Sequence, residues 1–593
     1  MEHRKAHKAV KFFKAYKAKR LATPIYFIES TAPYNVDDAD ERSMEQEFQS
    51  PRIGPTLATQ LHDANLTPFR DSNDAVKEIA QILASGTNPN LVIMVHGFNN
   101  PERNVLEMYA AAATAVDGDP VISARRGLVC VGYRWPSESM GAPIGSSWRA
   151  MAALPRRVFL LGLVLVAASL PLFYWVWQTA KEFTEHGFHL SQYGWPFLAH
   201  ASALAGWILL GLILMAILLR AIVYFRDNYR ATNYGVPDLI QVIRAIDGEI
   251  VRLYAERGVS KPPRNVELSF IGHSMGGFVV TNTIRTLSDV FAVPVLGLNS
   301  YGAEAPNPRL HGGEGPPPDS HDGERPIPRG ESPWDEIGNV FRLMRFVLAS
   351  PDIPAEALLS SRSNFLASSL VRFREAYLFS NEGDEVLRQI STLANYFVFP
   401  TKSSNYGFRL GNTEILSQGY GFIGPGLNGL LQTLRVGNLT LQELYDALGA
   451  AEASRHEIDQ PTRSEARLPE VFTYFDCTDY VDVDNNGVSR PLLTFAACNK
   501  SKDANAALSF RAHLRLLWAY VSSRQPNVHG GYFEGRLSQQ LIYRLACLGY
   551  VDTVAAFGGG PALDKGCKQK QIRVLLSPHL RRVPIPPPPT HQA

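Results

Sequence analysis

The chain has 593 residues, more than one ordinary hydrophobic core can hold, so we expect one large domain with insertions or two domains. A formal net charge of +2 gives no bulk attraction to nucleic acid, which argues against that class of partner. The five cysteines are scattered, with no CxxC pair, which argues against a disulfide framework or a structural zinc site and fits a reducing compartment.

Residues 1–22 form a basic N-terminal segment. Lys and Arg dominate its first twenty residues, and Ala9, Phe12, Phe13 and Tyr16 recur at helical spacing opposite a lysine face. This pattern predicts a basic amphipathic helix suited to an anionic membrane surface, with a solvated basic tail as the alternative. No apolar core follows the charges, so the pattern does not predict a signal peptide.

The first part of the main domain, residues 23–137, contains strands and a helix. Apolar runs predict strands over 24–29, 91–95 and 127–133, and an amphipathic stretch predicts a helix over 101–116.

Residues 138–235 form an insertion with two long apolar segments. Residues 158–180 carry no charge, and residues 196–219 have only His200 as an ionisable side chain, so each segment can cross about 30 Å of hydrocarbon as a helix. Arginines flank the outer ends, whereas the connection 181–195 has a single lysine, so the positive-inside rule places both outer ends in the cytoplasm. A pair of helices buried in a large soluble core is the alternative.

The second part of the main domain, residues 236–583, continues the alternation of helices and strands. A helix is predicted over 237–256, and strands are predicted over 266–271, 341–348, 376–380 and 471–475. Strands that alternate with helices predict a doubly wound, mostly parallel sheet. The Gly- and Pro-rich stretch 302–334 is predicted to be a flexible loop, and the Pro-rich tail 584–593 is predicted to be disordered.

A nucleophile-elbow pattern, Gly272-His-Ser-Met-Gly276, follows the strand predicted over 266–271 and precedes a predicted helix. In this context G-x-S-x-G holds a serine at the end of a sheet, next to a helix N-terminus. Gly272 and Gly276 allow strand and helix to approach without a side-chain clash. We therefore expect Ser274 to be an activated nucleophile.

A serine nucleophile needs a base and a third group that orients the base, in the chain order Ser, acid, His for this fold class. Asp384 follows the strand over 376–380 across a glycine turn and is the first choice for the acid. Asp352, at the end of the preceding strand, is the alternative acid. His529, on a Gly-rich turn before a predicted helix, is the expected base.

Other ionisable residues near these positions are assigned different roles. Glu382 and Glu385 are predicted to be solvated neighbours of the acid, and His513 is predicted to be a surface residue in the middle of a helix. His96 is expected to brace its own loop, and His273 belongs to the elbow but points elsewhere.

The oxyanion of an acyl-transfer reaction is stabilised by backbone N–H groups. The N–H of Met275, immediately after the nucleophile, is one expected donor. The second is expected from the loop after residues 91–95, with Phe98 as the first choice and Asn99 as the second.

Five short motifs together resemble a known family. They are Val95-His-Gly-Phe-Asn-Asn100, Tyr133-Arg-Trp-Pro-Ser137, Gly272-His-Ser-Met-Gly276, Ala349-Ser-Pro-Asp352 and Arg409-Leu-Gly411. The set resembles the bacterial alpha/beta-hydrolase family of unknown function whose members carry V-H-G-[FY]-N and W-P-S motifs. The resemblance spans residues 90–137 and 235–535 and implies an alpha/beta-hydrolase fold with serine chemistry. The inserted hairpin, the N-terminal extension and the 302–334 loop depart from that family.

The combined pattern predicts a membrane-anchored serine hydrolase of carboxylesterase or lipase type that needs no metal or organic cofactor. The hairpin leaves the domain after Ser137, at the edge of the sheet where α/β proteins bind ligands, which favours a lipid or another amphiphilic ester as substrate. A thioesterase, peptidase or acyltransferase with the same triad, and a non-catalytic membrane scaffold, are the alternatives. The expected location is the bacterial inner membrane, with two spans and with the main domain and both termini cytoplasmic. The bilayer is an expected partner, nucleic acid is not, and the oligomeric state is left open.

Overall fold

The computed structural model describes most of the main domain and part of the insertion. The described residues are 13–19, 21–32, 66–98, 100, 102–137, 170–182, 184–185, 195–292, 336–354, 369, 372–391, 409–415, 423–425, 472–484, 486–496, 508–521 and 524–577. The predicted flexible loop 302–334 and the predicted disordered tail 584–593 lie outside these residues.

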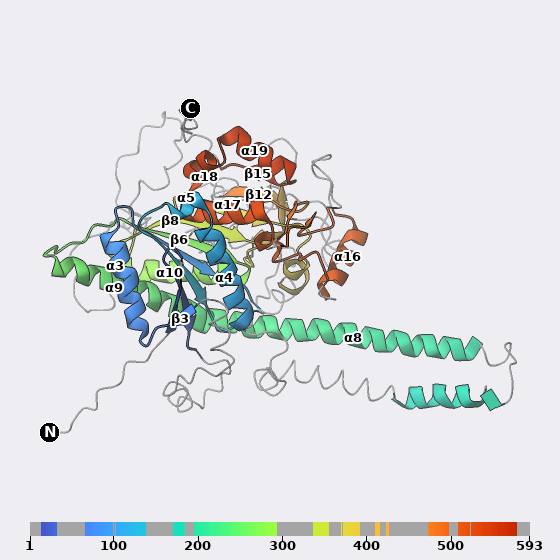
Figure 1. Cartoon of the computed structure of the whole chain (residues 1–593). Coiled ribbons are helices and arrows are strands. Elements are labelled where there is room, and N and C mark those ends of the chain that lie inside the picture. The colour runs from blue at the N-terminus through green and yellow to red at the C-terminus, as the bar shows by residue number, and fades with distance from the viewer. Residues whose placement is uncertain are drawn as a thin grey trace, which may run out of the picture.

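One large sheet forms the centre of the described part of the chain (Figure 1). In spatial order its strands are β15 (Arg573–Leu575), β12 (Thr473–Asp476), β9 (Glu375–Ser380), β8 (Phe341–Ala349), β6 (Val266–His273), β4 (Asn90–Val95), β5 (Leu128–Arg134), β2 (Ile25–Ser30), β1 (Phe13–Ala18) and β3 (Leu66–Pro68), while β7 (Glu336–Ile337) pairs with β8. Neighbouring strands from β12 to β2 are parallel, and the antiparallel pairs lie at the two ends of the sheet and at β7. The predicted α/β class with a mostly parallel sheet is confirmed.

Helices cover both faces of the sheet (Figure 1). One buried apolar cluster joins the sheet to α3 (Ser72–Ser85), α9 (Val236–Glu256) and α10 (Met275–Ala292), and a second joins it to α4 (Glu102–Asp117), α17 (Arg536–Cys547) and α18 (Tyr550–Ala556). Within β4, Leu91, Ile93 and Val95 belong to the first cluster and Val92 to the second. Because both faces are buried, the strand is a continuous apolar run, which explains why the sequence predicts it well.

The helix predicted over 237–256 is α9, and its sequence period explains its packing. Leu239, Val242, Ile243, Ile246 and Ile250 lie on one side and are all fully buried or nearly so. This spacing of three and four residues places them in a single stripe facing the sheet. Burial of each such side chain contributes about 1.5–3 kcal/mol before the entropy of ordering is subtracted.

The helix predicted within residues 1–22 is wrong over Phe13–Ala18, which is strand β1, paired antiparallel with β2. Phe13 and Ala15 enter one apolar cluster and Tyr16 the other, while Lys14 is exposed. The residues that suggest a helical period therefore also fit the alternation of a β-strand. Residues 1–12 lie outside the described part of the chain.

The predicted membrane segments fall on a helix over residues 170–182 and on α8 (Trp195–Arg230). The two run beside each other away from the sheet (Figure 1), and the Trp175 and His200 rings meet edge-on with centroids 4.6 Å apart. Residues 158–169 lie outside the described residues, and α8 is described by its backbone alone over 195–197, 209–210 and 212–223. Within the described stretches, no helix combines the length and the hydropathy that a membrane crossing requires.

At its other end α8 enters the main domain without a break. A π-helical segment, η2 (Ala231–Gly235), joins α8 directly to α9. The Tyr133 hydroxyl donates to the Gly235 carbonyl at 2.8 Å, and Trp135 packs so closely that a Cβ added at Gly235 would lie 3.0 Å from it. The insertion is therefore anchored to the end of β5 at both its exit and its return.

Candidate active site

Ser274 lies at the junction between β6 and α10, at the carboxyl edge of the sheet. Its φ of 53° lies in the left-handed region, which costs energy for a non-glycine residue and marks a strained turn. A Cβ added at Gly276 would lie 2.2 Å from the Val95 carbonyl oxygen, so only glycine permits this approach of α10 to β4. The elbow geometry expected around Ser274 is present.

The Ser274 side chain is held inside the site. Ser274 is fully buried, and its Oγ makes no hydrogen bond with the described residues. Its backbone is fixed on both sides, because its N–H donates to the Ala349 carbonyl at 3.0 Å and its carbonyl accepts from Asp352 N–H at 3.1 Å. Gly97 approaches from the other side, since a Cβ there would lie 2.7 Å from the Ser274 Cβ.

His529 and Asp384 form a close pair beside the elbow. Nδ1 of His529 lies 2.6 Å from Oδ2 of Asp384, a carboxylate with no exposed surface. Ser350 Oγ also donates to Oδ2, while the N–H groups of Val386 and Leu387 donate to Oδ1 at 3.1 and 3.2 Å. Every oxygen of the carboxylate is therefore occupied, which fixes its orientation toward the imidazole.

The second imidazole nitrogen of His529, Nε2, is buried and makes no hydrogen bond with the described residues. The ring of His273, the elbow residue before Ser274, lies beside the His529 ring, with centroids 5.0 Å apart, and its Nε2 lies 3.1 Å from the His529 carbonyl oxygen. Because Nδ1 faces a carboxylate, Nε2 is the nitrogen left to accept a proton from a hydroxyl such as that of Ser274.

The alternative acid, Asp352, has other partners. Its Oδ1 lies 3.2 Å from Nε of Arg409, and its Oδ2 accepts from Ser391 Oγ at 3.0 Å. The structure thus brings Asp384, and not Asp352, to His529.

Of the two expected oxyanion donors, Met275 follows Ser274 directly, and Phe98 follows Gly97, whose added Cβ would lie 2.7 Å from the Ser274 Cβ. Met275 is the first residue of α10, so its N–H has no partner within the helix. Phe98 is buried in the loop after β4, and its ring lies edge-on to His529 with centroids 6.2 Å apart. Asn99, the second choice, lies outside the described residues.

His96 and His273 are also buried next to the elbow. Burial lowers the pKa of His96 to about 3, and the charge of Arg134 acts in the same direction. Burial likewise lowers the pKa of His273 to about 3, assisted by the neighbouring His529. The His96 ring stacks on Trp135 with centroids 5.2 Å apart, and its Nδ1 lies 2.7 Å from the Gly97 carbonyl oxygen, as a loop brace would.

Three predictions about neighbouring residues are wrong. Glu382, Glu385 and His513 are all buried, although the first two are predicted to be solvated and His513 to lie on the surface. His513 Nδ1 lies 2.6 Å from Glu385 Oε1, and Arg388 Nη1 lies 2.9 Å from His513 Nε2. Buried charged groups are tolerated because they are paired, and no local pattern reveals pairs so far apart in sequence.

The sequence also misses residues of α8 that reach the site. Tyr224 packs edge-on against Phe98, with ring centroids 5.7 Å apart, and its hydroxyl accepts from Arg409 at 3.4 Å. Asp227 accepts a hydrogen bond from Ser137 Oγ at 3.0 Å. Both residues follow an apolar run that predicts a membrane span, so no local pattern distinguishes them as part of the site.

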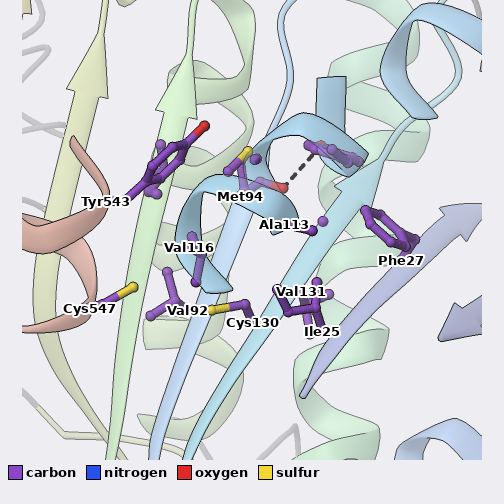
Figure 2. A pocket seen from close by; sticks show the side chains of 14 residues that line it. Ile25, Phe27, Val92, Met94, Ala113, Val116, Cys130, Val131, Tyr543 and Cys547 are labelled. Carbon is purple, nitrogen blue, oxygen red and sulfur yellow. Dashed lines mark hydrogen bonds between the residues drawn. The ribbon is translucent and has the colours of Figure 1, made fainter. Parts of the chain in front are cut away.

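A cavity of about 30 Å³ lies between the sheet and α4, lined mainly by apolar side chains such as Val92, Met94 and Val116 (Figure 2). It is close to the size of one or two water molecules, too small for an organic substrate. Ser274, Asp384 and His529 are not among its lining residues.

Comparison with protein-family models, curated proteins and solved structures finds no match to this chain.

Proposed function

We propose that this chain is a membrane-anchored serine hydrolase of carboxylesterase or lipase type. The observation that carries the proposal is the strained Ser274 at the strand–helix junction together with the His529–Asp384 pair beside it. A left-handed serine is costly, and such strain is retained where a nucleophile must be held out from a sheet.

In the acylation step Ser274 Oγ attacks the carbonyl carbon of an ester while His529 Nε2 takes the hydroxyl proton. Asp384 stabilises the imidazolium that forms and keeps Nδ1 protonated. The N–H groups of Met275 and Phe98 hold the negative oxygen of the tetrahedral intermediate. The intermediate collapses when the imidazolium returns its proton to the leaving alcohol, and an acyl-serine remains.

Deacylation repeats these roles with water as the nucleophile. His529 takes a proton from water as it attacks the acyl-serine, and then returns it to Ser274 Oγ as the carboxylic acid leaves. Ser274 Oγ and His529 Nε2 are buried, and neither atom forms a hydrogen bond with the described residues. Catalytic hydrogen bonds of this kind often tighten only when substrate is bound.

The proposed substrate is an amphiphilic or lipid ester at the cytoplasmic face of a bacterial inner membrane. Large apolar side chains are exposed along the helices of the insertion, at Leu170, Leu172, Phe173, Tyr174, Trp175, Trp177, Leu198, Trp207 and Ile208. Soluble proteins rarely expose so many contiguous apolar groups, and a bilayer would cover them. The arginines outside residues 158–180 and 196–219 support the cytoplasmic orientation.

Labelling by a fluorophosphonate probe tests the enzyme proposal, because such a probe reacts with an activated serine. We expect the detergent-solubilised full chain to be labelled and Ser274→Ala to be unlabelled. Ser269→Ala is the matched control, since Ser269 is also fully buried, lies in β6, the strand that ends just before Ser274, and belongs to no proposed step. Absence of labelling in the wild-type chain would favour the non-catalytic scaffold.

The same triad also serves thioesterases, peptidases and acyltransferases. Turnover of matched oxygen esters, thioesters and amides, with short and long acyl chains and with or without liposomes, ranks these candidates. A lipid esterase is expected to prefer long-chain oxygen esters presented in liposomes. Preference for a soluble amide, or for an alcohol acceptor over water, would favour one of the alternatives.

A further inference from the structure

The loop after β4 is connected to α8 by a chain of hydrogen bonds. Ser137 Oγ donates to Asp227 Oδ2 at 3.0 Å and accepts from the Asn100 N–H at 3.0 Å. The side-chain amide of Asn100 then donates to the Gly97 carbonyl at 3.2 Å and to the Phe98 carbonyl at 3.1 Å. This chain runs from the helix of the insertion to the residues expected to bind the oxyanion.

These hydrogen bonds are shielded from water at the end that involves α8. Ser137 and Asp227 have no exposed surface. Oδ1 of Asp227 lies 3.1 Å from Nη2 of Arg226 and 3.9 Å from Nη1 of Arg230, so the arginines balance the charge while Oδ2 faces Ser137. In a dry site a lost hydrogen bond is costly, so this arrangement is strongly preferred over alternatives.

Because the peptide group is planar, the hydrogen bond from Asn100 to the Gly97 carbonyl also sets the direction of the Phe98 N–H. The Gly97 carbonyl and the Phe98 N–H belong to one trans peptide unit and point in opposite directions. When Asn100 fixes the carbonyl, it also fixes where the Phe98 N–H points.

A second contact from the same helix reaches the same loop. Tyr224 lies three residues before Asp227, so the two share one face of α8. The Tyr224 ring packs edge-on against Phe98, with centroids 5.7 Å apart. The helix therefore contacts this loop at a side chain and, through Ser137, at its backbone.

We propose that Asp227, acting through Ser137 and Asn100, is a positioning residue that holds the oxyanion-binding N–H of Phe98 in the loop after β4. The inference rests on the serine chemistry proposed above and assigns a task to Ser137 of the Tyr133-Arg-Trp-Pro-Ser137 motif. It also makes the geometry of the site depend on the placement of α8.

The main test is Ser137→Ala, which removes the link between Asp227 and Asn100 in the full chain. We expect kcat for a soluble ester to fall by about 10- to 100-fold, because a misdirected donor loses part of the 10²–10³-fold effect of deleting one. KM is expected to change by less than about three-fold, since the lost interaction acts mainly in the transition state. Affinity for a trifluoromethyl ketone, whose serine adduct carries an oxyanion, should fall together with kcat/KM.

Ser30→Ala is a closely matched control. Ser30 Oγ donates to Asp238 of α9 and accepts from the Ala32 N–H at 3.2 Å, which repeats the same pattern away from the site. We expect Ser30→Ala to retain kcat and ketone affinity even where its melting temperature falls as much as that of Ser137→Ala. Equal kinetic losses in both variants would reduce Ser137 to a structural role and overturn the inference.

Amide hydrogen exchange separates this inference from the proposed function. Exchange in residues 97–100 should accelerate in Ser137→Ala and in Asp227→Asn, but not in Ser30→Ala. Unchanged exchange in this loop would overturn the inference whether or not the chain is an enzyme. If exchange accelerates in Ser137→Ala and Asp227→Asn but the wild-type chain is not labelled by the fluorophosphonate, the positioning link is retained and the serine chemistry is rejected.

Discussion

Asp384 and Asp352 are both buried carboxylates, but only Asp384 meets the imidazole of His529. We expect Asp384→Asn to lower kcat for a soluble ester by about 10³–10⁴-fold, because an amide cannot stabilise the imidazolium and favours the wrong tautomer. Steady-state kinetics in detergent solution measure this loss. The fully buried position of Asp384 makes a parallel measurement of melting temperature necessary.

Asp352→Asn is the matched control, because Asp352 pairs with Arg409 at 3.2 Å instead of with His529. Breaking a buried ion pair costs about 3–5 kcal/mol, so we expect a lower melting temperature and less than a ten-fold change in kcat. If Asp352→Asn lost more activity than Asp384→Asn, the assignment of the acid would be reversed.

His96 gives the fold a dependence on pH. Its folded pKa of about 3, set mainly by burial, lies below the ordinary value of about 6.5. Between these pH values the unfolded chain binds the extra proton, so this contribution to stability is complete above about pH 6.5 and is lost as pH falls. We expect His96→Gln to weaken the fall of melting temperature between about pH 7 and pH 5. A variant with the wild-type slope would show that His96 does not supply this dependence.

At the scale of elements, two glycines in helices are expected to respond oppositely to alanine. A Cβ added at Gly248 in α9 meets nothing within 4 Å, so Gly248→Ala should stabilise the chain by about 0.5–1 kcal/mol. A Cβ at Gly276 would lie 2.2 Å from the Val95 carbonyl oxygen, so Gly276→Ala must push α10 away from β4. Thermal unfolding should show a higher melting temperature for the first variant and a much lower one, or no folded protein, for the second.

The elements that the sequence predicts correctly are those buried on a whole face. β4 is an unbroken apolar run because both of its faces are covered, and α9 shows a full helical stripe. β1 fails because it is short and partly exposed, so Phe13 and Tyr16 fit a helical period as well as an alternating one. Prediction from sequence is therefore most accurate for strands and helices in which every position of the expected apolar pattern is buried.

In the candidate site, too, some residues can be predicted from the sequence and others cannot. Ser274, Asp384 and His529 carry local signatures, which are a glycine elbow, a strand end and a Gly-rich turn. The structure pairs Asp384 with His529, and the His529 ring lies 5.0 Å from the ring of His273, the residue before Ser274. The pairing of Glu385 with His513 and the contact of Tyr224 with Phe98 join residues more than 120 positions apart. The sequence around these four residues gives no local signal of the two contacts, because the contacts form only in the completed fold.

At the scale of the whole molecule, the exposed apolar helices of the insertion predict how the protein fractionates. We expect the full chain to remain in the membrane pellet after alkaline carbonate washing. Replacement of residues 158–219 by a Gly/Ser linker should release it into the soluble fraction, because the segments that would enter the hydrocarbon are then absent. The matched control replaces residues 302–334 with the same kind of linker and should stay in the pellet. A control that is also released would indicate that the linker itself disrupts the protein.

The π-helical segment η2 sets the rotational phase between α8 and α9. The two helices and η2 run without a break from Trp195 to Glu256. The π turn holds one residue more than an α-helical turn, so α8 and α9 keep their present phase with that residue included. Insertion of one alanine after Asn228, in the α-helical part of α8, would turn the preceding part of that helix by about 100° relative to the sheet. Tyr224 and Asp227 would then face away from the loop after β4, although helix content would hardly change. We expect such an insertion to suppress fluorophosphonate labelling while leaving the far-ultraviolet circular dichroism spectrum close to that of the wild type. The angular setting of α8, rather than its length, would then determine whether the insertion supports the site.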